Sequence, residues 1–197
     1  GSSAELYDPI YYWRGTLTGT VVNWENPVYV DSTAVIAQIV EAQAVGNKVA
    51  IVWPKPIDPT FVGGAAQSYN NIVYIEYTDG GQNWGSLQYA TNQDTLTAGD
   101  FAYTDVDAVY DADGTLHIVY NTRDYREDDV GELGLFNTPA RLWHWNDLCG
   151  ISRLIAEANY SNACNEEGNP FLIGSWNLLI AKPNITIKPA GVYTAHT

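Results

Sequence analysis

The densest group of ionisable side chains lies in the segment TRDYREDDVGE, residues 122–132. Carboxylate oxygens are the ligands that calcium prefers in proteins. The candidate calcium ligands are Asp124, Asp128, Asp129 and Glu132. The segment lacks the alternating acidic positions and the correctly placed glycine of an EF-hand loop. A solvated acidic loop that pairs with Arg123 and Arg126 explains the same residues, so the sequence leaves both interpretations open.

Aromatic side chains form a second group of candidate functional residues, because exposed indole and phenol rings can stack on the faces of sugars. They are concentrated in YDPIYYWRG, residues 7–15, and in RLWHWND, residues 141–147. The candidate ligand platform consists of Tyr12, Trp13, Arg14, Trp143 and Trp145. Packing between sheets also needs large aromatic rings, and that alternative stays open for the same residues.

The sequence gives weaker evidence for two further kinds of chemistry, glycoside hydrolysis and disulfide formation. A glycosidase needs two carboxylates about 5–10 Å apart. The sequence has 23 acidic residues, and it neither excludes such a pair nor shows which residues would form it. The catalytic residues are therefore unknown. Cys149 and Cys164 show no zinc-ligand spacing. In an oxidising compartment they would form a disulfide worth about 3 kcal/mol in the chain-entropy model; two separate buried thiols are the alternative.

Composition narrows the class of protein. The 197 residues include 23 acidic and 9 basic side chains, a formal net charge of −14, which excludes a surface for nucleic acid. No apolar run approaches the ~18 residues of a membrane span, so we expect no membrane insertion. Abundant aromatic and glycine residues favour strands and turns over helices. This composition fits a secreted, extracellular or cell-surface protein.

Two kinds of strand pair alternate along the chain and predict the fold. Apolar hairpins with a glycine turn occupy 37–54, 105–121 and 184–197. More aromatic, more polar pairs occupy 9–24, 71–91 and 141–158. Both kinds recur with a period of about 65–70 residues, which makes one four-stranded unit per repeat. We therefore expect an all-β protein, a β-propeller of four-stranded antiparallel blades with about three blades' worth of strands.

One turn carries a recognisable motif. The segment YTDGGQNW, residues 77–84, resembles the Asp-box, or BNR repeat, of sialidase-like propellers, Ser/Thr-x-Asp-x-Gly-x-Thr-Trp. Asp79, Gly81 and Trp84 match the motif. The chain differs from it at Tyr77, where the motif has Ser or Thr, and at Asn83, where the motif has Thr. The chemistry is structural: Asp79 accepts turn N–H groups, Gly80 and Gly81 adopt positive φ, and Trp84 packs back on the hairpin. The box is expected to hold a turn, not to catalyse.

The resemblance implies a blade count and a range of functions. Residues 1–197 would form one domain or part of one: a half-blade at 9–30, blades at 34–91 and 104–158, and a half-blade at 184–197. Sialidase-like propellers have six blades, so this chain would be half of one. A second copy of the chain, or the missing half of a longer protein, would then close the ring and cover its open strand edges.

Function follows less directly, because Asp-box propellers include glycosidases, receptors, assembly factors and adhesive modules. A sialidase needs three arginines that clamp a carboxylate, and no arginine here lies in the Arg-Ile-Pro context of the first of them. We therefore expect an extracellular, non-catalytic module that binds glycan or protein or builds a surface assembly. The alternative is a glycoside hydrolase whose active site is completed by a missing segment or a second chain.

Overall fold

The computed structural model describes residues 7–33, 40–43, 47–60, 64–77, 83–94, 97–159, 179–188 and 192–196. Its strands pair antiparallel throughout, and the one helix of this part of the chain is the short α1 (Gly64–Ser68). The predicted all-β class is thus confirmed. None of the described helical residues forms an apolar helix long enough to cross a membrane.

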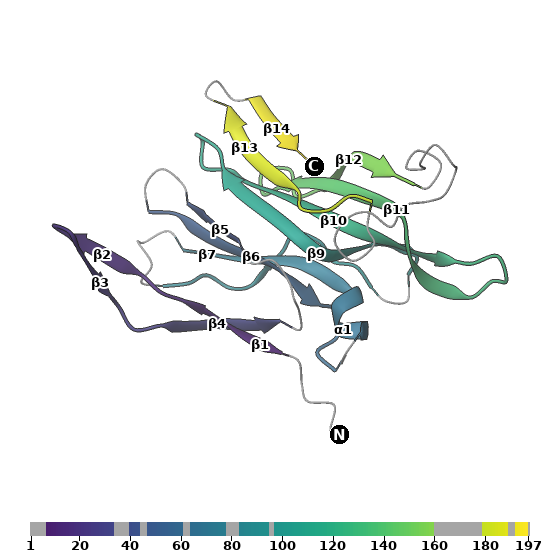
Figure 1. Ribbon diagram of the computed structural model, residues 1–197, viewed down its shortest axis with the longest axis horizontal. Coiled ribbons are helices and arrows are strands. Elements are labelled where there is room, and N and C mark those ends of the chain that lie inside the picture. Colours follow the sequence, from purple (N-terminus) through teal and green to yellow (C-terminus); the bar gives the residue numbers. More distant parts are fainter. Residues whose placement is uncertain are drawn as a thin grey trace.

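Eight strands form the central sheet as two runs of consecutive neighbours (Figure 1). The first run is β5 (Val40–Gln43), β6 (Val49–Pro56), β7 (Asn70–Tyr77) and β8 (Gln88–Tyr89). The second run is β9 (Gly99–Tyr110), β10 (Leu116–Glu127), β11 (Leu133–Asn146) and β12 (Arg153–Ala158). The runs join where Asn70 of β7 pairs with Ala102 of β9. Each run is therefore a four-stranded antiparallel meander.

The turn between β9 and β10 shows how the sequence specifies these hairpins. Gly114 has a φ of 80°, a conformation that glycine adopts without steric penalty. The Asp111 side chain accepts backbone hydrogen bonds from Asp113 (2.9 Å) and Thr115 (2.8 Å). After this turn, apolar residues alternate along β10, with Leu116 and Ile118 on one face and Val119 on the other. Both faces are buried, as expected of a strand between two layers.

The apolar faces of the two meanders meet in one core. Val52 and Tyr74 of the first meander and Ile118 and Trp145 of the second belong to the same buried cluster. The rings of Tyr74 and Trp145 lie 5.4 Å apart, centroid to centroid. The two meanders are therefore packed layers, joined at their edge by the pairing of β7 with β9.

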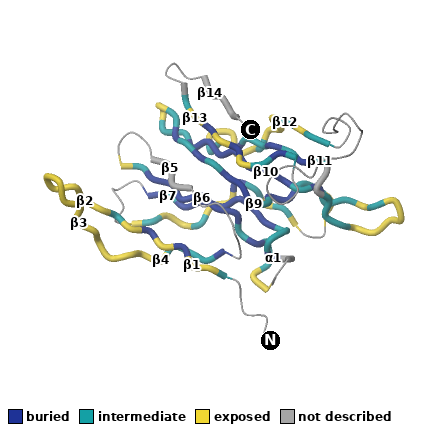
Figure 2. The backbone as a smooth tube through the Cα atoms, viewed as in Figure 1, coloured by how far each residue is buried: buried dark blue, intermediate teal, exposed yellow. Residues whose placement is uncertain are grey.

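A hairpin covers each outer face of this pair of layers (Figures 1 and 2). On one side, β1 (Asp8–Tyr12) pairs with β4 (Val28–Thr33), β2 (Gly15–Thr18) pairs with β3 (Val21–Trp24), and Ile10 and Tyr12 pack on β6 and β7. On the other side, β13 (Asn184–Lys188) pairs with β14 (Val192–His196), and Ile185 packs on Val119 and Leu142. Four layers of antiparallel strands result.

These four layers do not close into a barrel or a propeller within the described ranges. The predicted propeller, and the division of the chain into blades and half-blades, therefore stay predictions. What the structure establishes is the stack itself, whose two inner layers are four-stranded meanders.

Candidate functional site

A cleft of about 200 Å³ opens where the two meanders join. It lies between the segment that follows β8 and the second meander, which contributes residues from β9, β10 and β11 and the residue before β12. Its lining residues are Thr91, Asn92, Gln93, Asp100, Tyr120, Trp143 and Ser152. The cleft therefore combines hydroxyl and amide groups, one carboxyl group and one indole ring.

Asn71 of β7 fixes the first wall of the cleft. Its side-chain oxygen accepts hydrogen bonds from the backbone N–H of Gln93 (2.7 Å) and from the Thr91 hydroxyl (3.0 Å). The Thr91 hydroxyl in turn accepts the backbone N–H of Ile72 (2.9 Å). Asn71 is only 3% exposed, so a buried amide holds this wall in one position against the sheet.

Trp143 and Tyr120 form the opposite wall, and each side chain is held by a hydroxyl group. The indole Nε1–H of Trp143 donates to Thr122 Oγ1 (3.1 Å), and the Tyr120 hydroxyl donates to Ser152 Oγ (2.7 Å). Burial raises the pKa of Tyr120 well above its usual value, so this hydroxyl stays protonated at physiological pH. Both rings are thus oriented before any ligand binds.

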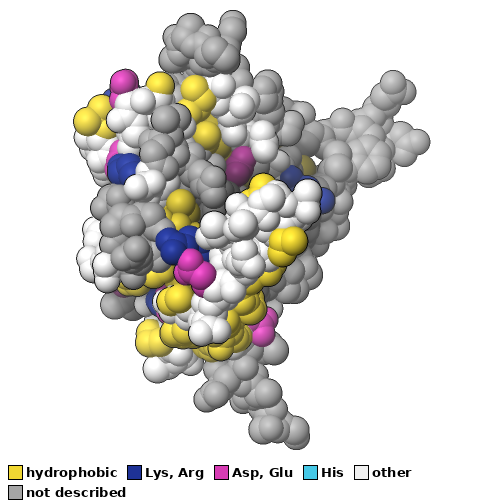
Figure 3. Space-filling model, turned by 90° about the vertical axis from the view of Figure 1, so that its left-hand side faces the viewer, with side chains coloured by type: hydrophobic (Ala, Val, Ile, Leu, Met, Phe, Trp, Pro, Cys, Tyr) yellow, Lys and Arg dark blue, Asp and Glu magenta, His cyan; other side chains and the backbone are white. Residues whose placement is uncertain are grey.

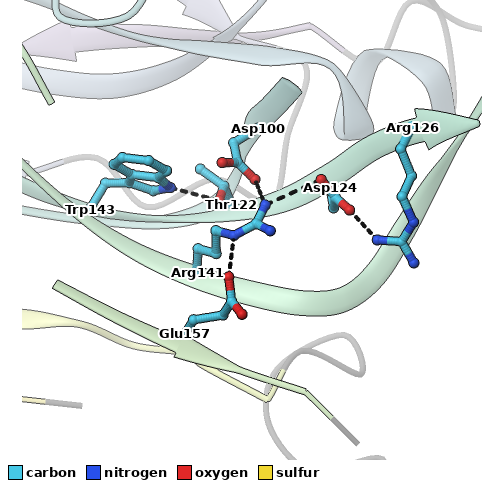
Figure 4. A network of polar contacts seen from close by, with 7 residues as sticks. All are labelled: Asp100, Thr122, Asp124, Arg126, Arg141, Trp143 and Glu157. Carbon is cyan, nitrogen blue, oxygen red and sulfur yellow. Dashed lines mark hydrogen bonds and ion pairs between the residues drawn. The ribbon is translucent and has the colours of Figure 1, made fainter. Parts of the chain in front are cut away.

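Arg141 lies beside the cleft at the centre of a charged network (Figure 4). Its Nη1 donates to Asp100 Oδ1 (2.6 Å) and Asp124 Oδ1 (3.2 Å), and its Nε donates to Glu157 Oε2 (2.7 Å). Burial lowers the pKa of Arg141, but its hydrogen bonds to Glu157 and Asp100 outweigh this effect and raise the pKa overall. Arg141 is therefore a permanent cation that three carboxylates already surround.

Asp100 belongs both to this network and to the lining of the cleft. Burial raises the pKa of its carboxyl group and outweighs the opposite effect of Arg141. Asp124 is also held by Arg126 and does not line the cleft. Asp100 is consequently the one acidic group among the described lining residues that can accept a hydrogen bond from a ligand.

The four candidate calcium ligands do not come together. Asp124 lies in the arginine network, whereas Asp128 Oδ1 accepts the backbone N–H groups of Val130 and Glu132 (2.9 Å each) in the turn between β10 and β11. Asp129 and Glu132 are exposed. In the part of the chain that the structure describes, no three acidic, histidine or cysteine side chains are placed to hold a metal ion. Arg126 pairs with Asp124, as the solvated-loop interpretation expects, but Asp124 is buried and Arg123 donates to Ser68 Oγ (3.1 Å). Both interpretations of this segment therefore stay predictions.

The five aromatic-platform candidates also occupy different places. Tyr12 and Trp145 are 8% and 4% exposed, so the packing alternative describes them. Trp143 lines the cleft. Trp13 is half-exposed on the N-terminal hairpin, where the neighbouring Arg14 pairs with Glu25. These five residues therefore do not make one site.

The predicted Asp-box lies outside the described residues at Asp79, Gly80 and Gly81. Its last residue, Trp84, packs edge-on against Tyr77 (centroids 4.4 Å apart) and Tyr12 (5.1 Å). The hydroxyls of Tyr12 and Tyr77 are hydrogen-bonded to each other (2.6 Å). This ring cluster joins the first hairpin to β7.

The predicted disulfide is absent at Cys149, which is exposed with a free thiol; Cys164 lies outside the described residues. We therefore expect Cys149 to react rapidly with Ellman's reagent in the folded protein. The measurement is thiol release under native conditions, followed by mapping of the labelled peptide. Recovery of a linked Cys149–Cys164 peptide from unreduced protein would contradict the structure.

Sequence reasoning did not single out Asp100, Arg141 or the Thr91–Gln93 segment as a site. Arg141 is 41 positions from Asp100 in the chain, and the residues of the cleft come from both meanders, so they meet only where the meanders join. Scans with protein-family models and a search of curated proteins give no match to this chain.

Proposed function

We propose that this chain is part of an extracellular β-propeller of the sialidase-like Asp-box kind and that it binds carbohydrate without catalysing a reaction. Two observations support the architecture: each inner layer is a four-stranded antiparallel meander, and the layers stack face to face, as the blades of a propeller do. The strands that would close the ring come from a second copy or from the rest of a longer protein.

The observation that carries ligand binding is the composition of the cleft. A sugar presents hydroxyl groups, which need donors and acceptors, and C–H faces, which need an apolar ring. The cleft supplies hydroxyl and amide groups, the Asp100 carboxyl group and the Trp143 indole. Its walls are held by hydrogen bonds to Asn71 and Thr122, so binding costs little ordering of side chains.

The charges favour a neutral sugar. A sugar carboxylate is best recognised by a free arginine fork. Arg141 donates to three carboxylates already, and Asp100 would repel an anion that entered the cleft. The net charge of −14 adds to this repulsion and equally disfavours nucleic acid.

We expect Trp143→Ala to weaken binding of a neutral oligosaccharide by about tenfold or more, because stacking on one aromatic ring is worth about 1–3 kcal/mol where it has been measured for planar ligands. Glycan-array screening identifies the oligosaccharide, and calorimetry measures its affinity. Asn92→Ala removes an exposed amide of the same cleft and should also weaken binding. This second variant tests the proposal even if Trp143→Ala folds poorly. Trp24→Ala, a tryptophan outside the cleft, should bind normally. Absence of binding to any neutral glycan, or equal losses in all three variants, would contradict the proposal.

A glycoside hydrolase is the second candidate, and one observation favours it. Asp100 and Asp124 contact the same nitrogen of Arg141, so their carboxyl groups are near neighbours, as the two acids of a retaining glycosidase are. Of the two, Asp100 lines the cleft, and a hydrolase would require Asp124 to reach the sugar from behind it. The raised pKa of Asp100 suits a general acid. Turnover of fluorogenic neutral glycosides that is lost in Asp100→Asn would establish the hydrolase. Binding without turnover would favour the module.

A further inference from the structure

A group of six exposed apolar side chains lies on the N-terminal hairpin. It comprises Tyr11, Trp13, Leu17, Val22, Trp24 and Tyr29, which are between 42% and 67% exposed; we call it the aromatic strip. Figure 3 looks onto the end of the molecule where β2 and β3 project and shows hydrophobic side chains gathered over its lower part. Continuous apolar surface of this kind marks an interaction site in a soluble protein.

Contacts and register place the strip on one face of the hairpin. The Tyr11 ring lies 6.1 Å from that of Trp13 and 5.9 Å from that of Tyr29, and Trp13 and Trp24 line one shallow hollow. Gly15 pairs with Trp24, and Leu17 pairs with Val22. Because alternate residues of a strand share a face, Leu17, Val22 and Trp24 lie together, while Val21 lies on the opposite face.

The strip is held in shape by the backbone beneath it. A Cβ atom at Gly15 would lie 2.6 Å from Val22 Cγ1 and 3.0 Å from Trp24 Cε3. Glycine at this position therefore lets both side chains lie across the neighbouring strand. The Glu25 N–H donates to the Arg14 carbonyl (2.8 Å) and makes one continuous hairpin of the four strands.

Among the residues that the structure describes, no element covers this surface. Every residue of β2 and β3 is exposed, whereas β1 contributes Ile10 and Tyr12 from its other face to the core. The inner layers bury similar mixtures of aromatic and aliphatic side chains where they meet. The strip thus has the composition of a contact between layers.

We infer that the aromatic strip is where a second copy of this chain docks, strip against strip about a two-fold axis. Charge permits this occupant: two chains of net charge −14 repel each other, but the strip carries no charged residue and the adjacent Arg14 and Glu25 neutralise each other, so the contact itself adds no repulsion. A two-fold contact needs a surface that complements itself, and an uncharged apolar face does so. The inference does not depend on sugar binding at the cleft.

The size of the strip predicts a weak dimer. An aromatic side chain offers about 150–250 Å², so four half-exposed rings give roughly 400 Å² per copy, and Leu17 and Val22 add to this. The pair of strips would bury on the order of 1,000 Å² in total, which is near the lower bound of specific interfaces. The dimer should therefore dissociate on dilution.

Sedimentation velocity between about 1 and 100 µM, a range suited to the weak end of protein interfaces, tests the inference. The whole chain should shift with concentration from 21.7 kDa toward twice that mass. Trp24→Lys should raise the dissociation constant about tenfold or more, because it places a charge in the centre of the contact. Val21→Lys makes the same change of charge on the opposite face of the hairpin and should dimerise like the unaltered chain.

Three results would overturn the inference: an unaltered chain that is monomeric at the highest concentration, equal weakening by Val21→Lys, or dimerisation that survives Trp24→Lys. If the chain is monomeric and neutral oligosaccharides change its tryptophan fluorescence, but no longer do so after Trp24 is replaced, the strip is a sugar-binding surface instead. Neither β2 nor β3 contributes to the core, so both lysine variants should keep the circular dichroism spectrum of the unaltered chain. Oligosaccharide binding at the cleft is measured on the same variants. A chain that binds sugar but does not dimerise would refute the dimer and leave the proposed function standing.

Discussion

Arg141→Ala should lower the free energy of unfolding by about 3 kcal/mol, because removal of one partner leaves buried carboxylates without a counter-charge. The Asp100 and Asp124 side chains are 17% and 12% exposed, so water replaces the guanidinium poorly. Glu157 is 40% exposed and contributes little. Urea denaturation at neutral pH measures the loss.

Arg126→Ala is the matched control, since Arg126 binds the same Asp124 but is itself 43% exposed. A surface pair of this kind is worth about 0–1 kcal/mol. If Arg126→Ala and Arg141→Ala have equal effects, or if neither changes the midpoint, the network does not stabilise the fold as described.

The loss in Arg141→Ala should also depend on pH. A carboxyl group whose pKa is raised by folding stabilises the fold fully below its unfolded pKa of about 3.9, and this contribution disappears as the pH rises through the folded pKa. Asp100 is such a group, and removal of Arg141 raises its pKa further. The difference between variant and unaltered chain should therefore be largest near neutral pH and shrink as Asp100 becomes protonated. A difference that grows toward acid pH would contradict this assignment.

Trp84→Ala should cost about 3 kcal/mol, near the lower end for a tryptophan removed from a packed site, because Trp84 is only partly buried. Its ring is packed edge-on between Tyr77 and Tyr12, and the void would separate the first hairpin from β7. Thermal and urea unfolding of dilute protein measure the effect.

The role of Trp84 is structural, so oligosaccharide affinity of the folded variant should not change. Trp24→Ala deletes an equally large side chain that is 67% exposed, and it should alter stability by no more than about 0.5 kcal/mol in dilute protein. Loss of ligand binding with an unchanged melting temperature in Trp84→Ala would show that the predicted Asp-box belongs to a binding site.

The strand content of the fold was predictable because it rests on local signals. The turn at Gly114 and the alternation along β10 are encoded in a few consecutive residues. The joining of β7 to β9 was not predictable, because it depends on a single residue pair, Asn70 with Ala102. Closure of a ring has no local signal either, since it depends on strands that pair at the ends of the stack.

The candidate site was less predictable than the fold. Trp143 was identified as a ligand candidate from its residue type, but Trp145, two residues away, is in the core. Which of the two rings reaches the cleft depends on how β11 packs against the first meander. Burial raises the pKa of Asp100 against the opposing effect of Arg141, which is distant from it in the chain, so this shift depends on tertiary packing. Residue type indicated the chemistry, but tertiary packing selected the residues.

Nuclear magnetic resonance of the labelled chain tests the central claim, that the cleft binds a neutral sugar, most directly. Neutral oligosaccharides of glucose, galactose, mannose or xylose are titrated in turn, each beside a uronic-acid counterpart. The Trp143 indole N–H and the backbone amides of Thr91–Gln93 should shift saturably with at least one neutral ligand, and the acidic counterpart should bind more weakly. Saturable shifts that leave Trp143 and Thr91–Gln93 unmoved, or tighter binding of the acidic sugar, would contradict the account.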